Sequence, residues 1–167
     1  MNSLTKLSIP FALGLVAITA IASSASADEV VGQPGSYLGA GVSLNALATT
    51  PSALGANITG RLKFDNSPIS LRSTVLFGNG GTSVTPTVSY DLPVSDRASV
   101  YLGAGGSFNL NNNNTLTGDR QSFVLQPGAE VSVSKQVVLY GNAIVPISGS
   151  TIGSAGTSVQ GGVGFQF

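Results

Sequence analysis

The carboxyl-terminal segment of the chain alternates between apolar and polar or small residues and ends on an aromatic side chain. The odd-numbered residues from Val159 to Phe167 are Val, Gly or Phe, and the even-numbered residues from Ser158 to Gln166 are Ser, Gln or Gly. A period of two places these sets on opposite faces of a β-strand. The last residues of soluble domains tend instead to be poorly ordered. The segment therefore predicts a strand that separates an apolar medium from a polar one.

The amino terminus predicts a secretory signal peptide over residues 1–27. Lys6, an apolar stretch over residues 11–21 and a run of small residues ending at Ala27 follow one another in the order that signal peptides share. The alternative is a membrane-anchoring helix, which needs about 20 apolar residues, and this stretch is shorter. We therefore predict cleavage after Ala27 and a short amino-terminal segment, residues 28–35, before the folded domain.

The predicted mature chain begins at Asp28 and keeps 140 of the 167 residues, which suits one domain. The whole chain has no cysteine, so disulfides contribute no stability to the exported protein. It has no histidine, which excludes a Ser-His-Asp triad and a histidine-ligated metal. Its formal charges cancel, and loss of Lys6 leaves the mature chain at −1, which provides no basic surface for nucleic acid. We predict no catalytic residue, no cofactor, no metal and no nucleic-acid partner.

An internal repeat indicates the spacing of the strands. The segment YLGAGVSLN at residues 37–45 recurs as YLGAGGSFN at residues 101–109, an offset of 64 residues. Membrane strands of ~10 residues with short links repeat every ~16 residues, so the offset corresponds to four strands. Chance recurrence in a glycine-rich chain is the alternative. Together with the alternation along the chain, the repeat predicts eight strands, near residues 36–44, 56–64, 69–77, 84–92, 98–108, 121–133, 137–145 and 158–167.

The predicted links between strands alternate in length. Long links on one side and short turns on the other are typical of outer-membrane barrels, which place loops outside and turns in the periplasm. Only residues 78–83 are short where a long link is expected. The long links, rich in Asn, Thr, Ser, Gly and Ala, are residues 45–55, 109–120 and 146–156, and the turns are residues 65–67, 93–96 and 134–135.

Aromatic residues lie on the apolar face near both ends of the predicted strands. Such bands match the aromatic girdles that seat a barrel at the two membrane interfaces, although strands favour aromatic residues in any setting. The band at the periplasmic ends contains Phe64, Tyr90, Phe165 and Phe167, and the band at the opposite ends contains Phe77, Phe108 and Phe123.

The charged residues of the predicted strands share the polar face, which a barrel of eight strands turns inward. An Arg or Lys on the lipid face near mid-membrane would cost about 2–4 kcal/mol, which selects this register. We predict a polar plug in the periplasmic half, with Gly, Ser, Thr, Asn and Gln lining the outer half. The alternative is a gate or narrow solute path, but an eight-stranded interior is only wide enough for side chains. The plug residues are Arg61, Lys63, Arg72, Asp91, Glu130, Tyr37, Tyr101 and Tyr140.

Over residues 36–167 the chain resembles the small outer-membrane β-barrels of the OmpA/OmpX type from Gram-negative bacteria. The resemblance implies an all-β, eight-stranded, antiparallel up-and-down transmembrane barrel in the cell outer membrane, surrounded by outer-membrane lipid. It also implies that the barrel assembly machinery reads Phe167, Phe165 and Val163 as the assembly signal. Two residues depart from the pattern, because Pro86 and Pro127 fall inside predicted strands, where a closed barrel has no free edge.

These patterns predict a non-enzymatic protein with a structural or surface-interaction role in the cell envelope. One alternative is a narrow pore for small solutes. Another is a secreted soluble barrel that binds an apolar ligand inside, which requires the apolar face to point inward. The absence of histidine argues against barrel-type lipid A deacylases and omptin-like proteases. The sequence identifies no surface ligand.

Overall fold

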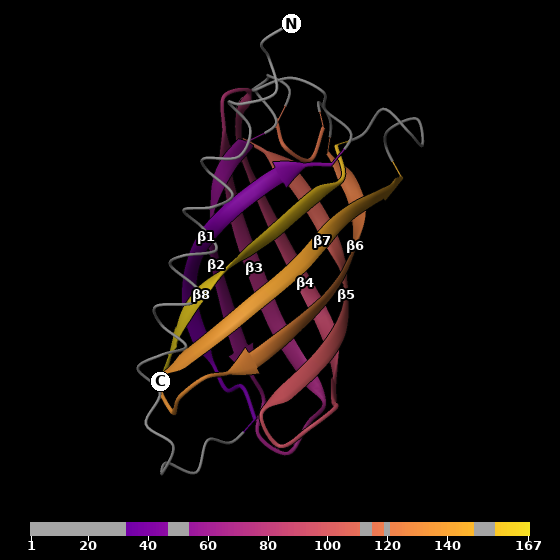
Figure 1. Ribbon diagram of the computed structural model, residues 1–167. Coiled ribbons are helices and arrows are strands. Elements are labelled where there is room, and N and C mark those ends of the chain that lie inside the picture. The colour runs from indigo at the N-terminus through magenta and orange to yellow at the C-terminus, as the bar shows by residue number, and fades with distance from the viewer. Residues whose placement is uncertain (1–32, 47–53, 111–114, 119–120, 149–155) are drawn as a thin grey trace, which may run out of the picture. The chain divides into compact units, whose positions relative to one another are not determined.

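The computed structural model describes residues 33–46, 54–110, 115–118, 121–148 and 156–167. The predicted signal peptide and the cleavage site before Asp28 lie outside these residues. Within them, no helix has the length and apolar character needed to cross a membrane. Eight strands form one closed sheet (Figure 1): β1 (Tyr37–Asn45), β2 (Leu54–Lys63), β3 (Ile69–Gly78), β4 (Gly81–Pro93), β5 (Ala98–Asn109), β6 (Ser122–Ser132), β7 (Val137–Ser148) and β8 (Ser158–Gln166).

Each strand pairs antiparallel with its neighbours in sequence, and β1 pairs with β8 to close the barrel. The closing register runs from Tyr37 opposite Gln166 to Asn45 opposite Ser158. The two copies of the YLGAG repeat lie in β1 and β5, as their offset predicts. Full closure leaves no edge strand, so every strand has a hydrogen-bonding partner on both sides. The prediction of an eight-stranded antiparallel barrel is confirmed.

The links give the barrel two unlike ends. At one end, which we call the turn end, short turns join β2 to β3, β4 to β5 and β6 to β7, and the carboxyl terminus lies there (Figure 1). At the other, the loop end, longer links follow β1, β5 and β7. The exception at residues 78–83 is a hairpin in which Gly78 pairs with Gly81, and Gly81 has a φ of 136° that only glycine adopts readily.

The outer surface of the barrel is apolar and the interior is mostly polar. Leu38 is 60% exposed and Leu102 is 55% exposed, whereas Arg61 and Glu130 are each 1% exposed. Among the described residues, 23 polar or charged side chains are buried, against eight apolar or tyrosine side chains. This arrangement is typical of a barrel surrounded by lipid. The alternative of a soluble barrel with an apolar ligand inside is therefore wrong, because the apolar face points outward.

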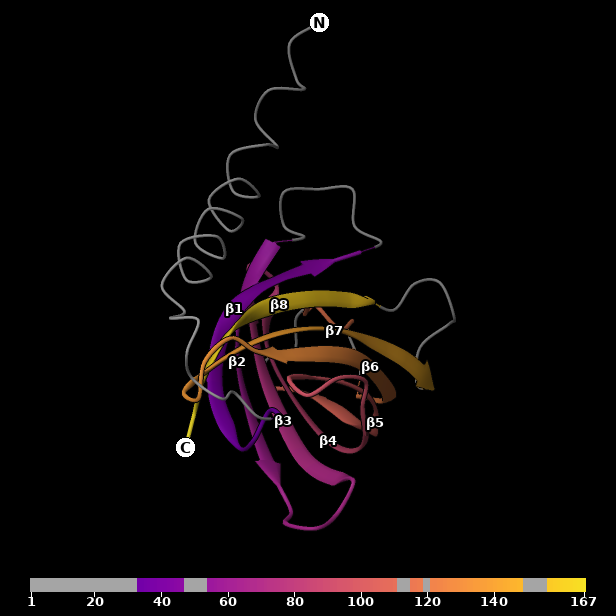
Figure 2. The ribbon, with the colours of Figure 1, turned by 60° about the horizontal axis from the view of Figure 1, so that its bottom comes forward.

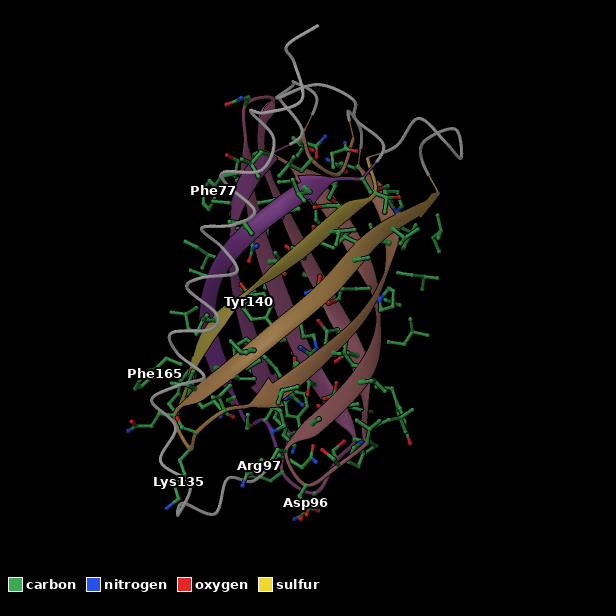
Figure 3. All side chains as sticks on the ribbon, viewed as in Figure 1. Phe77, Asp96, Arg97, Lys135, Tyr140 and Phe165 are labelled. Carbon is green, nitrogen blue, oxygen red and sulfur yellow. The ribbon has the colours of Figure 1, made fainter. Side chains whose placement is uncertain are left out.

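The aromatic residues of the predicted girdles lie on the outer surface near the strand ends. Phe77 at the loop end and Phe165 at the turn end both project from the wall (Figure 3). The exposed fractions are 52% for Phe64, 53% for Tyr90, 57% for Phe165, 80% for Phe167, 40% for Phe77, 45% for Phe108 and 69% for Phe123.

Both prolines that depart from the strand pattern lie on the outer surface, where local gaps in pairing accommodate them. The pairing of β4 with β5 omits Thr85 and Pro86 but resumes in the same register at Thr87. The pairing of β6 with β7 likewise omits Gln126 and Pro127. Each proline keeps its pairing with the strand on its other side. A missing donor thus interrupts one ladder locally without shifting the register.

Candidate functional site: the filled barrel interior

Four charged residues form a closed ring of ion pairs inside the turn-end half of the barrel. Arg61 on β2 donates to Asp91 on β4 and to Glu130 on β6, each with an N···O distance of 2.7 Å. Arg72 on β3 donates to Asp91 at 3.0 Å and also pairs with Glu130. All four side chains are at least 93% buried. The ring is electrically neutral, so it satisfies four buried charges without a counter-ion.

Hydroxyl groups add further hydrogen bonds to the charged ring. Ser70 donates to Asp91 and accepts from Arg61 Nε at 3.1 Å. Ser89 accepts from Arg72 Nε at 2.8 Å. These short side chains come from β3 and β4, the strands that also hold Arg72 and Asp91. Their positions keep the guanidinium planes fixed between the two carboxylates.

The ring reaches across the whole lumen because β2 and β6 face each other in a closed barrel of eight strands. Tyr37 from β1 donates to Glu130 at 3.0 Å, and the Arg72 guanidinium lies 3.5 Å from the centre of the Tyr101 ring on β5. Such a contact between a cation and an aromatic face is attractive. Side chains from six strands therefore meet at one level of the interior.

The predicted plug residue Lys63 does not join this ring. It is exposed at the end of β2, two residues beyond Arg61 and on the same face of the strand. The exposed Lys63 side chain lies beyond the buried part of the lumen and extends its ammonium group into water. The prediction is wrong for Lys63 because alternation gives the face of a strand but not the depth at which the lumen ends.

A layer of amides and Tyr140 fills the middle of the interior. Tyr140 donates to Asn57 at 2.6 Å and stacks on Tyr37, with ring centres 5.9 Å apart. Asn142 accepts from both Gln126 and Gln160, at 3.2 and 2.6 Å. Tyr140 thus lies above the charged ring and bonds to an amide, and it appears inside the wall at mid-height in Figure 3.

Inward-facing glycines make room for the three tyrosine rings. A Cβ atom added at Gly128 would collide with the Tyr101 ring, and one added at Gly164 would collide with the Tyr37 ring. The same holds for Gly162 and the Tyr140 hydroxyl group. Each ring therefore lies flat against the wall over a position without a side chain. Gly128, Gly162 and Gly164 are therefore packing positions.

The loop end is closed by residues Thr115–Gly118 of the link between β5 and β6, which fold into the mouth of the barrel. Thr115 and Gly118 form an isolated antiparallel bridge. Leu116 is 4% exposed and clusters with Leu76 on β3, Val124 on β6 and Ile144 on β7. We call residues Thr115–Gly118 the lid.

Hydroxyl and amide side chains of the barrel wall form hydrogen bonds with the lid. Thr117 bonds to Ser83 on β4 at 3.1 Å and to Ser107 on β5 at 2.8 Å. Asn109 donates to the Gly118 carbonyl at 3.0 Å. The prediction that Gly, Ser, Thr, Asn and Gln line the outer half misses the apolar cluster around Leu116, which lies there together with these polar groups.

The chain matches no family model and no curated protein. Solved structures share its fold at low sequence identity. A de novo designed transmembrane β-barrel is 18% identical with a TM-score of 0.55, and the match covers 80% of this chain and 97% of the design.

The outer-membrane protein Ail of Yersinia pestis also shares the fold. Its crystal structure with the heparin analogue sucrose octasulfate is 15% identical with a TM-score of 0.52, covering 79% of this chain and 97% of Ail. Its backbone structure in a phospholipid bilayer nanodisc is 14% identical with a TM-score of 0.51, and the match covers 80% of this chain and 100% of the Ail chain. The fold is that of a small eight-stranded transmembrane β-barrel.

Proposed function

We propose that this chain is an integral outer-membrane β-barrel protein that acts through its lipid-facing wall and its loops, not through its lumen. One observation carries the proposal: the interior is filled at three levels by side chains that bond to one another, whereas the wall is apolar. Because the lumen is closed in this way, the protein has a structural or surface-interaction role in the cell envelope and not a transport role. The absence of histidine and cysteine supports a protein without catalytic activity.

Planar bilayer recording with the refolded protein tests this proposal against the narrow-pore alternative. We expect no steady conductance from the unmodified protein, because the charged ring and the lid both obstruct the lumen. A large and steady conductance would overturn the proposal. A conductance that arises only in a Glu130→Ala variant would identify the ring as the element that closes the lumen.

Membrane location has a separate test. We expect the native protein to require detergent for extraction and to migrate faster on gels before boiling than after it, because folded membrane barrels resist detergent until heated. Recovery of the folded protein in an aqueous periplasmic fraction would contradict an outer-membrane location.

The surface-interaction role differs from that suggested by the Ail complex. The links at the loop end, residues 46–53, 110–121 and 149–157, contain one basic residue, Arg120, beside one acidic residue, Asp119. Recognition of a sulfated polyanion needs several basic groups. We therefore expect no retention of this protein on immobilised heparin at physiological salt, and retention there would contradict this expectation.

We also propose that Phe167 is part of the assembly signal, together with Phe165 and Val163. Phe167 is 80% exposed, so its ring contributes little to the folded barrel itself. Deletion of Phe167 should reduce outer-membrane levels in cells and leave refolding in micelles nearly unchanged. Normal cellular levels of the truncated protein would contradict this role.

A further inference from the structure

The segment Gln33–Ser36, upstream of β1, lies over the turn-end mouth of the barrel. At its near end, the Gly35 amide donates to Gln166 Oε1 at 2.7 Å, and Ser36 accepts from the Phe167 amide at 3.1 Å. These bonds fix the segment to the seam between β1 and β8. Figure 2 turns this end of the barrel toward the viewer.

The far end of the segment is anchored on the opposite wall. The Gln33 side chain donates to the carbonyls of Ser95 and Ala98, at 3.2 Å for Ala98. Ser95 belongs to the turn between β4 and β5, and Ala98 begins β5. In a closed barrel with strands in sequential order, this turn lies across the mouth from the seam between β1 and β8.

The middle of the segment covers the charged ring. Arg61 Nη1 donates to the Pro34 carbonyl at 2.9 Å and to the Gly35 carbonyl at 3.4 Å. Pro34 is itself buried. The segment therefore supplies hydrogen-bond acceptors to the Arg61 guanidinium in addition to those that the strands supply. It also separates this charged group from water at the mouth.

We propose that residues Gln33–Ser36 form a strap that closes the turn-end mouth against water and small solutes, with Gln33 as its anchor on the far wall. The strap is a second closure beneath the charged ring, and among the described residues it is the part of the closure at this end that does not belong to a strand. It can therefore leave the mouth by local opening while the barrel stays intact.

The chain offers a clean reporter for this opening, because it has no cysteine of its own. Ser99 lies next to Ala98, pairs with Glu130 in the sheet and is 4% exposed. Its hydroxyl group has no hydrogen-bond partner among the described residues, so a Ser99→Cys change loses no bond there. Ser158 is equally unpartnered and 0% exposed near the loop end, which makes Ser158→Cys the matched control.

The experiment measures how fast a small charged methanethiosulfonate modifies each thiol in the refolded, full-length protein. An exposed thiol in Gln136→Cys at the same end gives the unprotected rate. We expect the Ser99→Cys thiol to react at least about tenfold more slowly than this reference. In a Gln33→Gly/Pro34→Ser background, its rate should rise about tenfold, and the Ser158→Cys rate should stay constant.

Three results would overturn the proposal: a Ser99→Cys thiol that already reacts like Gln136→Cys, a rise of less than threefold in the altered background, or an equal rise at Ser158→Cys. The last would indicate general loosening of the barrel. Gel mobility before boiling checks that each variant is folded. If the double variant does not fold, Gln33→Ala removes the anchor alone and takes its place, with the same expected direction and the same threefold limit.

Discussion

The two ends of the barrel interior are closed by different chemistry from different parts of the chain. At the turn end, Arg61, Arg72, Asp91 and Glu130 project from four strands and pair as ions. At the loop end, a four-residue lid inserts one leucine into an apolar cluster. The first closure is part of the sheet, and the second folds back onto it.

This difference implies different responses to mutation. Each ion of the ring contacts two oppositely charged partners, so loss of one leaves those two partners sharing a single counter-charge, a net charge of one in a water-poor interior. Loss of the Leu116 side chain from the lid removes apolar contacts, but it leaves no buried charge without a partner. We therefore expect the turn end to determine global stability more than the loop end does.

The largest effect is expected for Glu130→Ala, which deprives both Arg61 and Arg72 of one carboxylate and Tyr37 of its acceptor. Removal of one partner from a buried ion pair typically destabilises by about 3–5 kcal/mol. Urea unfolding in lipid vesicles, followed by circular dichroism because the chain has no tryptophan, measures the change in the free energy of unfolding.

Lys63→Ala is the matched control for Glu130→Ala. Lys63 lies at the same end of the barrel but is exposed and outside the ring, so its loss should change the free energy of unfolding by less than about 0.5 kcal/mol. Equal losses of unfolding free energy from the two changes would contradict the distinction between the buried charged ring and the exposed end of β2.

Leu116→Ala tests the loop end and should have an intermediate effect. Truncation of a buried leucine costs about 2–5 kcal/mol, and we expect the lower end of this range because the lid is a short segment that can readjust. Leu110→Ala is the control, since Leu110 precedes the lid in the same link and is 63% exposed. A loss as large as that for Glu130→Ala would contradict the ranking of the two ends.

Gly128→Ala should have a smaller effect, because it adds one methyl group against the Tyr101 ring. Overpacking of this kind costs about 1–3 kcal/mol. Gly60→Ala is the control: its added Cβ would meet only Leu38 on the outer surface, at 3.9 Å. If both changes were neutral, the glycines under the tyrosine rings would not be required by packing.

The sequence predicts the turn end much better than the loop end, and the reason is physical. Arg61, Asp91 and Glu130 lie in strands, where a period of two and the cost of charge in lipid place them inside. The alternation does not give their partners, because Glu130 meets Arg61 across the lumen from a strand 69 residues away. It also fails at Lys63, where the strand leaves the lumen.

The lid and the strap are the parts that sequence reasoning missed. Leu76 shares the inward face with Thr74, so its apolar side chain on that face was a usable signal of an apolar patch inside. Leu116 and Gln33 lie outside the strands, where no periodicity indicates the direction of a side chain. Their positions depend on tertiary contacts that only the closed barrel provides.

The smallest expected effect is the energetic coupling between the two closures. The ring and the lid share no hydrogen-bond or ion-pair partner among the described residues, and a layer centred on Tyr140 and Asn142 lies between them. Mutations at sites without shared partners usually add to within about 0.5 kcal/mol. The double variant Glu130→Ala/Leu116→Ala should therefore lose the sum of the two single losses, measured by the same urea unfolding. A coupling above about 1 kcal/mol would mean that the amide layer transmits strain from one end to the other, and the interior would then act as one plug instead of two separate closures.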